Sequence, residues 1–105
     1  MFRLLLLLVL PILAAAQSAA EDPLQRAVAA HQAGDYAGAI QGYQEFLKAH
    51  PEAAAVRSNL GAALVHEGRF EEAIREYTLS LDADPGNSKI RLNLALAYYK
   101  SVWID

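Results

Sequence analysis

The sequence predicts an all-α fold: a short right-handed solenoid of about five helices, arranged as antiparallel pairs, behind an N-terminal signal peptide. Three observations lead to this prediction. Residues recur at a spacing of 34 positions, the apolar residues within each repeat have helical periodicity, and the chain begins with a short apolar segment. With 105 residues in all, the chain has room for one small domain after this segment.

The first 16 residues have the three parts of a secretory signal peptide. Met1–Arg3 is a basic start, Leu4–Leu13 is an almost unbroken apolar run, and Ala14–Ala16 supplies small residues before a cleavage point expected no later than about residue 20. The run is shorter than the roughly 20 residues of a membrane-spanning helix. We therefore expect an exported protein, periplasmic or secreted, without a stable membrane span after cleavage. Retention of the segment as a loose anchor and an accidental apolar start are the alternatives.

Composition excludes several kinds of chemistry. The chain contains no Cys, which removes disulfides, thiolate nucleophiles and Cys-based zinc sites. Its 9 Lys and Arg residues face 12 Asp and Glu residues, a net charge of −3. Because nucleic acids are bound by basic surfaces, this balance argues against a nucleic-acid partner.

A shift of 34 positions places residues 20–53 on residues 54–87, and a partial third copy occupies 88–105. The paired positions include glycines, aromatics and prolines: Gly34 and Gly68, Tyr36 and Phe70, Ala39 and Ala73, Ile40 and Ile74, Tyr43 and Tyr77, Leu47 and Leu81, Ala49 and Ala83, Pro51 and Pro85. A fixed period of this length is typical of stacked arrays, in which each unit buries its apolar face on the next. We expect residues 20–105 to form this domain.

Each repeat is expected to hold two amphipathic helices. Helices are predicted at 22–33, 37–49, 54–67, 71–83 and 88–101. Gly34 and Gly68 are expected to end the first helices in a left-handed conformation, and Pro51 and Pro85 to close the second helices. The first helix has few apolar residues and is expected to be a weak cap. The recurring aromatics are expected to pack between helices.

These residues resemble the tetratricopeptide repeat (TPR) over Ala20 to about Lys100. The resemblance rests on the following positions: Asn59-Leu60-Gly61, Leu64, Gly68, Ala73, Tyr77 and Pro85. The family's tryptophan is replaced by Arg57 and Arg91. The resemblance implies protein–protein interaction, with a peptide or partner helix held on the concave surface that the first helices line.

The resemblance also implies a set of groove residues. Gln25, Asn59 and Asn93 share one repeat position, and an Asn amide both donates to and accepts from a peptide backbone. The expected groove set comprises Gln25, Ser58, Asn59, His66, Lys89 and Asn93. Asn59, Lys89 and Asn93 match part of a clamp for a C-terminal carboxylate, whereas the first unit lacks the basic residue and the Asn of a full clamp. Each of these side chains alone is equally consistent with a solvated helix face.

No catalytic or metal-binding motif appears. The chain has no nucleophile elbow, P-loop or dinucleotide-binding turn, so we expect no enzyme activity and no cofactor. His31 and His66 are expected to approach one another, but no metal-ligand spacing accompanies them.

The third repeat breaks where a third Gly is expected, because the chain has Val102 followed by Trp103, Ile104 and Asp105. We expect Leu94, Ala97 and Tyr98 to be partly uncovered. Three explanations remain open: a truncated product of a longer array, a fifth helix that is an adequate cap, or a tail that docks on a partner or a second copy. A spacer that self-associates through 88–105 is therefore the alternative function.

Overall fold

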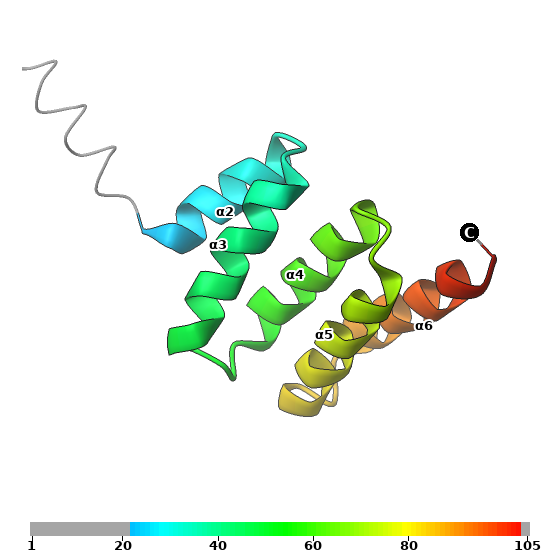
Figure 1. Ribbon diagram of the computed structural model, residues 1–105. Coiled ribbons are helices and arrows are strands. Elements are labelled where there is room, and N and C mark those ends of the chain that lie inside the picture. Colours follow the sequence, from blue (N-terminus) through cyan, green and yellow to red (C-terminus); the bar gives the residue numbers. More distant parts are fainter. Residues whose placement is uncertain (1–21, 104–105) are drawn as a thin grey trace, which may run out of the picture.

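The computed structural model describes residues 22–103, which form five helices joined by short turns (Figure 1). In chain order these are α2 (Pro23–Gln32), α3 (Tyr36–Ala49), α4 (Ala54–His66), α5 (Phe70–Ala83) and α6 (Ser88–Trp103). All five predicted helices are confirmed, with α6 ending two residues later than expected. The predicted signal peptide at 1–16 lies outside the described residues. None of the helices in the described part of the chain is long and apolar enough to cross a membrane.

Each helix packs against the next one in the chain, and α4 also touches α6 (Figure 1). The helices pair as α2 with α3 and α4 with α5, and α6 lies against α5. This sequential packing is the architecture that the 34-residue period predicts. The right-handed sense of the solenoid stays a prediction.

The turns within the two pairs depend on glycine conformation. Gly34 and Gly68 have φ angles of +83° and +75°, a left-handed backbone that other residues rarely adopt. Asp35 then accepts a hydrogen bond from the N–H of Gly38 at 3.0 Å and so caps α3. The helix ends predicted from these two glycines are confirmed.

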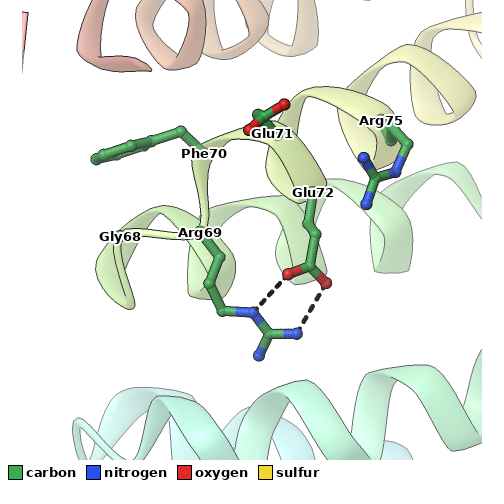
Figure 2. Close-up of a pocket in the computed structure, with 6 residues that line it drawn as sticks. All are labelled: Gly68, Arg69, Phe70, Glu71, Glu72 and Arg75. Carbon is green, nitrogen blue, oxygen red and sulfur yellow. Dashed lines mark hydrogen bonds and ion pairs between the residues drawn. The ribbon is translucent and has the colours of Figure 1, made fainter. Parts of the chain in front are cut away.

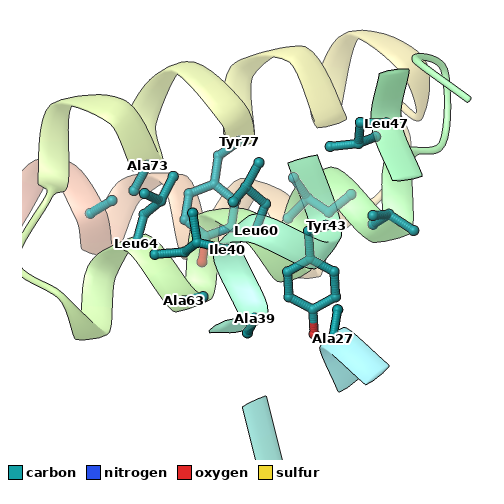
Figure 3. Packing of buried hydrophobic residues seen from close by; sticks show 13 residues of the cluster. Ala27, Ala39, Ile40, Tyr43, Leu47, Leu60, Ala63, Leu64, Ala73 and Tyr77 are labelled. Carbon is teal, nitrogen blue, oxygen red and sulfur yellow. The ribbon is translucent and has the colours of Figure 1, made fainter. Parts of the chain in front are cut away.

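Two tyrosines from equivalent repeat positions form the centre of the core. Tyr43 is 1% exposed and Tyr77 is 3% exposed, and both belong to one core cluster with buried alanine, leucine, isoleucine and valine side chains (Figure 3). Burial raises the pKa of Tyr77 to about 12. The predicted packing role is confirmed for both, while Tyr36 and Phe70 are half-buried at the helix starts.

Close approach of paired helices requires a glycine in each pair. A Cβ atom added to Gly61 on α4 would lie 2.8 Å from Cε1 of Tyr77 on α5. In the first pair the glycine is on the second helix, where a Cβ atom on Gly42 would lie 2.5 Å from Cβ of Ala27. Gly61 is therefore needed for packing space, since its backbone is ordinary helix.

The expectation for α6 needs one correction. Ala97 was expected to be partly uncovered, but it is 1% exposed and joins the core with Ile90. The reason is that α5 covers the face of α6 on which Ile90 and Ala97 lie one above the other. Leu94 is half-buried and Tyr98 is 53% exposed, as expected.

Candidate functional site

A depression of about 430 Å³ lies where the first helices of successive repeats meet. Its walls come from α2, α4, α6 and the turn before α6, and its lining residues are His31, Ala55, Ser58, Asn59, Ala62, Asn87, Lys89, Ile90 and Asn93. One surface hollow therefore contains side chains from all three first helices.

A smaller depression of about 120 Å³ shares Ala62 and Asn93 with the first one. Its other lining residues are Val65, His66, Tyr77, Leu96, Ala97 and Lys100. Because these two lining residues are common to both hollows, the two hollows form one continuous surface along α4 and α6. We call it the α4–α6 groove.

The structure brings five of the six predicted site residues to this groove. Ser58, Asn59, Lys89 and Asn93 line the larger depression, and His66 lines the smaller one. Gln25 is not among the lining residues of either depression. It is exposed in the first turn of α2, where its backbone N–H donates to Asp22 Oδ1 at 2.9 Å. The groove lies along α4 and α6, and α2 contributes only His31, near its other end.

The orientation of Lys89 and Asn93 depends on the cap of α6. Asn87 Oδ1 accepts hydrogen bonds from the backbone N–H groups of Lys89 and Ile90, both at 3.1 Å. Its Nδ2 donates to Asp84 Oδ2 at 3.0 Å, which holds the amide in this orientation. The cap thereby fixes the first turn of α6 beside the groove.

Charge in the groove differs in sign from the charge of the whole chain. The two Lys residues that line it, Lys89 and Lys100, lie toward opposite ends of α6, and no carboxylate occurs among the lining residues described. The rest of the surface therefore carries the acidic excess of the chain. This arrangement favours ligands with hydrogen-bonding and anionic groups over cationic ones.

Sequence reasoning missed several lining residues that the repeat register identifies. Leu96 stands 34 positions after Ala62, and Lys100 stands 34 positions after His66. In each pair both members line the groove. Asn87 had no signal of this kind, because its place in the lining follows from its capping role.

An aromatic cluster lies at one edge of the groove, between the first and second repeats. The rings of Tyr36 and His66 stack with centroids 4.2 Å apart and an interplanar angle of 1°. His31 Nδ1 and Tyr43 Oη form a hydrogen bond of 2.9 Å, and the ring centroids of His31 and His66 are 6.4 Å apart. The expected approach of the two histidines is confirmed. No cluster of three or more metal-ligating His, Cys, Asp or Glu side chains exists among residues 22–103.

The pKa of His31 is lowered, first by burial and second by the nearby charge of His66. Burial also raises the pKa of the Tyr43 hydroxyl. A lowered pKa means that the folded chain binds a proton at His31 less readily than the unfolded chain does, so protonation favours unfolding.

Another hollow, of about 290 Å³, lies at the turn between α4 and α5 (Figure 2). Here Arg69 Nε and Nη2 each donate to a carboxylate oxygen of Glu72 at 2.8 Å. This bond to Arg69 is the main reason that the pKa of Glu72 is lowered. The two charged groups satisfy one another at an exposed turn, so this hollow presents no unpaired charge from Arg69 or Glu72. The α4–α6 groove is therefore the candidate functional site.

We predict that acid destabilises the fold through His31. Stability should be highest above the unfolded pKa of His31, near 6.5, and should fall as the pH drops toward the lower folded value. Replacing His31 by Gln should flatten this dependence between pH 7 and 5, as measured by urea unfolding at each pH. His50→Gln is the matched control and should retain the dependence. An unchanged slope in His31→Gln would contradict the assignment.

Comparison with known proteins agrees with this architecture. A sequence model of the tetratricopeptide repeat family matches residues 24–88. The chain is 33% identical, over 83% of its length, to a TPR repeat-containing thioredoxin of Arabidopsis thaliana. It is 34% identical, over 67% of its length, to small glutamine-rich tetratricopeptide repeat-containing protein 2 of Mycosarcoma maydis. The aligned regions span 13% and 20% of those two proteins. The chain belongs to the tetratricopeptide repeat family.

Proposed function

We propose that the chain is a protein–protein interaction module and that the α4–α6 groove holds a peptide or a helix of its partner. The observation that carries this proposal is that Asn59 and Asn93, from the same position of successive repeats, line one depression. Tetratricopeptide repeat domains generally bind other proteins, which supports the assignment to a binding module.

The side chains of the groove suit recognition of a polypeptide backbone. Each Asn amide has two donor hydrogens and an acceptor oxygen, so Asn59 and Asn93 together match the alternating N–H and C=O groups of a peptide. Ser58 adds a hydroxyl, and Lys89 adds a positive charge for a carboxylate. Apolar atoms of Ala62 and Leu96 line the groove between these polar groups and provide contacts for a partner's aliphatic side chains.

The proposal assigns binding without catalysis and without a cofactor. It rests on the absence from the sequence of nucleophile, phosphate-binding and dinucleotide-binding motifs. Ser58 and His31 both line the groove, but the hydrogen bond of the His31 ring goes to Tyr43 Oη and not to the Ser58 hydroxyl. The two relatives carry the matched repeats within much longer proteins, so their names do not assign a partner to this chain.

We further propose that the protein is exported and works in a periplasm or outside the cell. The support is the sequence of residues 1–16, with its basic start, apolar run and small residues. Mass spectrometry of the product isolated from the expressing cells tests this proposal. A new N-terminus between residue 17 and about residue 21 is expected, and a product that retains Met1 and stays in the cytoplasm would contradict export.

We predict that the double variant Asn59→Ala, Asn93→Ala loses peptide binding and keeps its fold. Random 12-residue peptides displayed on phage are selected on the wild-type chain, and the Kd of a selected peptide is measured by isothermal titration calorimetry. Because each lost hydrogen bond contributes roughly 0.5–1.5 kcal/mol, we expect binding to weaken about tenfold or more.

The control for this experiment is Gln25→Ala, which changes the same repeat position outside the groove. It should bind the selected peptide with the wild-type Kd. Circular dichroism at 222 nm checks that both variants remain helical. An unchanged Kd in the double variant, or an equal loss in Gln25→Ala, would remove the asparagines from the site.

A further inference from the structure

Two histidines from different repeats lie close together in the wall of the α4–α6 groove. His31, near the end of α2, lines the larger depression, and His66, the last residue of α4, lines the smaller one. Their ring centroids are 6.4 Å apart. Histidine is the side chain whose charge ordinarily changes between pH 5 and 8. The charge in this part of the groove therefore changes with pH in that range.

One nitrogen of the His31 ring is engaged by the protein and the other is not. Nδ1 forms the 2.9 Å hydrogen bond with Tyr43 Oη, whereas no described residue bonds to Nε2. Since no buried polar side-chain atom in the described part of the chain lacks a hydrogen-bond partner, Nε2 is exposed to solvent. In the protonated ring both nitrogens carry a hydrogen, so Nδ1–H donates to Tyr43 and Nε2–H is available to a ligand.

The His66 ring is positioned by stacking and not by hydrogen bonds. It is exposed, it lies parallel to the ring of Tyr36 with centroids 4.2 Å apart, and no described residue forms a hydrogen bond with it. A stacked ring touches its neighbour through a face, whereas its N–H groups lie at the edge. Both histidines therefore offer an N–H donor at the groove wall that the described residues do not use.

No acidic group of the groove faces the two histidines. The acidic residues nearest to them along the chain are Asp35 and Glu67, in the turns after α2 and α4. Asp35 Oδ1 accepts the hydrogen bond of the Gly38 N–H, and Glu67 is exposed and absent from the groove lining. The other titratable side chains that contact the pair or share its hollows are Tyr36 and Tyr43 from α3, Tyr77 from α5, and Lys89 and Lys100 from α6.

Protonation of both rings thus places two like charges side by side with no anion between them among the described residues. The effect is visible at His31, whose pKa is lowered first by burial and second by the charge of His66. An anion that enters from outside relieves both the repulsion and the loss of hydration.

We propose that the groove binds a carboxylate side chain of its partner between His31 and His66, and that a proton is taken up from solution when it binds. This inference rests on the proposed function, because it names the chemistry of one part of the same groove. A carboxylate has two oxygens, and charge-assisted hydrogen bonds of about 2.8 Å from one nitrogen of each ring let it bridge rings at this separation. Repulsion between the rings is then replaced by two attractive contacts.

The direction of the pH dependence follows from the protons that each state binds. In the free chain the lowered pKa of His31 favours the neutral ring. A bound carboxylate acts in the opposite direction and raises the pKa of His31 in the complex. The complex then holds more protons than the free chain, so binding tightens as the pH falls from 7.5 to 6. A carboxylate bound by a lysine ammonium, which already carries its charge, takes up no proton.

The test repeats the phage selection of 12-residue peptides on the full chain at pH 6.0, with EDTA present so that no metal ion contributes. We expect the selected peptides to share an Asp or Glu at one position. One of them that lacks His is synthesised with blocked termini, and its Kd is measured by calorimetry at pH 7.5 and 6.0. We expect the Kd to be about threefold to tenfold lower at pH 6.0.

Proton uptake is measured directly at pH 6.5, by titrations in phosphate and in bis-Tris buffer. The two buffers release different heats when they lose a proton, so the difference between the two binding enthalpies gives the number of protons taken up. We expect roughly half a proton for each peptide bound.

Changes in the peptide and in the chain identify the groups that hold the proton. A peptide with the shared acidic residue changed to its amide should take up no proton, and this change leaves the chain untouched if a His variant is less stable. His31→Gln should lose the uptake, and His66→Gln, which introduces the residue that Gln32 supplies in the first repeat, should weaken binding at pH 6.0. His50→Gln alters an exposed histidine outside the groove and should keep the wild-type uptake. Circular dichroism checks the fold at each pH.

The outcomes separate this inference from the proposed function. A peptide that binds with the same enthalpy in both buffers would overturn the inference and leave the proposed function standing. Proton uptake that persists in His31→Gln, or with the amide form of the peptide, would overturn the inference as well. If no peptide binds the wild-type chain at either pH, the proposed function fails and the inference fails with it.

Discussion

The close contact of α4 with α5 is the interaction on which the rest of the structure depends. Tyr77 lies against the backbone of α4 at Gly61, where any added Cβ atom would come within 2.8 Å of the ring. Full burial of a side chain of this size stabilises the fold by roughly 2–3 kcal/mol, whereas the ion pair of Arg69 with Glu72 is exposed to solvent, which screens it. Packing, and not surface charge, therefore sets the spacing of the two helices.

That spacing also places the groove. With α5 fixed on α4, the following turn brings α6 against α5, and the amide of Asn87 fixes the first turn of α6. Asn93 then lies across the same hollow as Asn59. The candidate groove thus follows in part from the repeat period, because Asn59 and Asn93 occupy the same position of successive repeats and line one hollow. The uncovered side of α6 follows from the period as well, because the described residues include only the first helix of the third repeat.

Most of the fold could be predicted from sequence, because glycine, proline and aromatic residues recur at one fixed spacing. Gly34 and Gly68 ended their helices as expected, and Tyr43 and Tyr77 are buried as expected. The burial of Ala97 could not be predicted, since the helical stripe of α6 does not say how far α5 overlaps it. A period alone also identifies α6 as a helix without its partner, but not what covers it.

The candidate site was less predictable than the fold. Shared repeat position grouped Gln25 with Asn59 and Asn93, yet the groove lies along α4 and α6 and α2 reaches it only through His31. Repeat position indicates which way a side chain faces, whereas the depth of the surface depends on how neighbouring repeats are stacked. His31 does not share the repeat position of the two asparagines. It lines the groove because of the way the first repeat stacks on the second.

The central claim is that Asn59 and Asn93 contact the ligand directly, and their side-chain amides can be observed by NMR. The ¹⁵N-labelled chain is titrated with a groove-selected peptide, and the Nδ2 resonances of the two asparagines are followed. The account predicts that both resonances shift in proportion to occupancy and that their exchange with water slows, because each amide gains a hydrogen bond. A peptide that saturates the chain while both resonances stay unchanged would contradict the account.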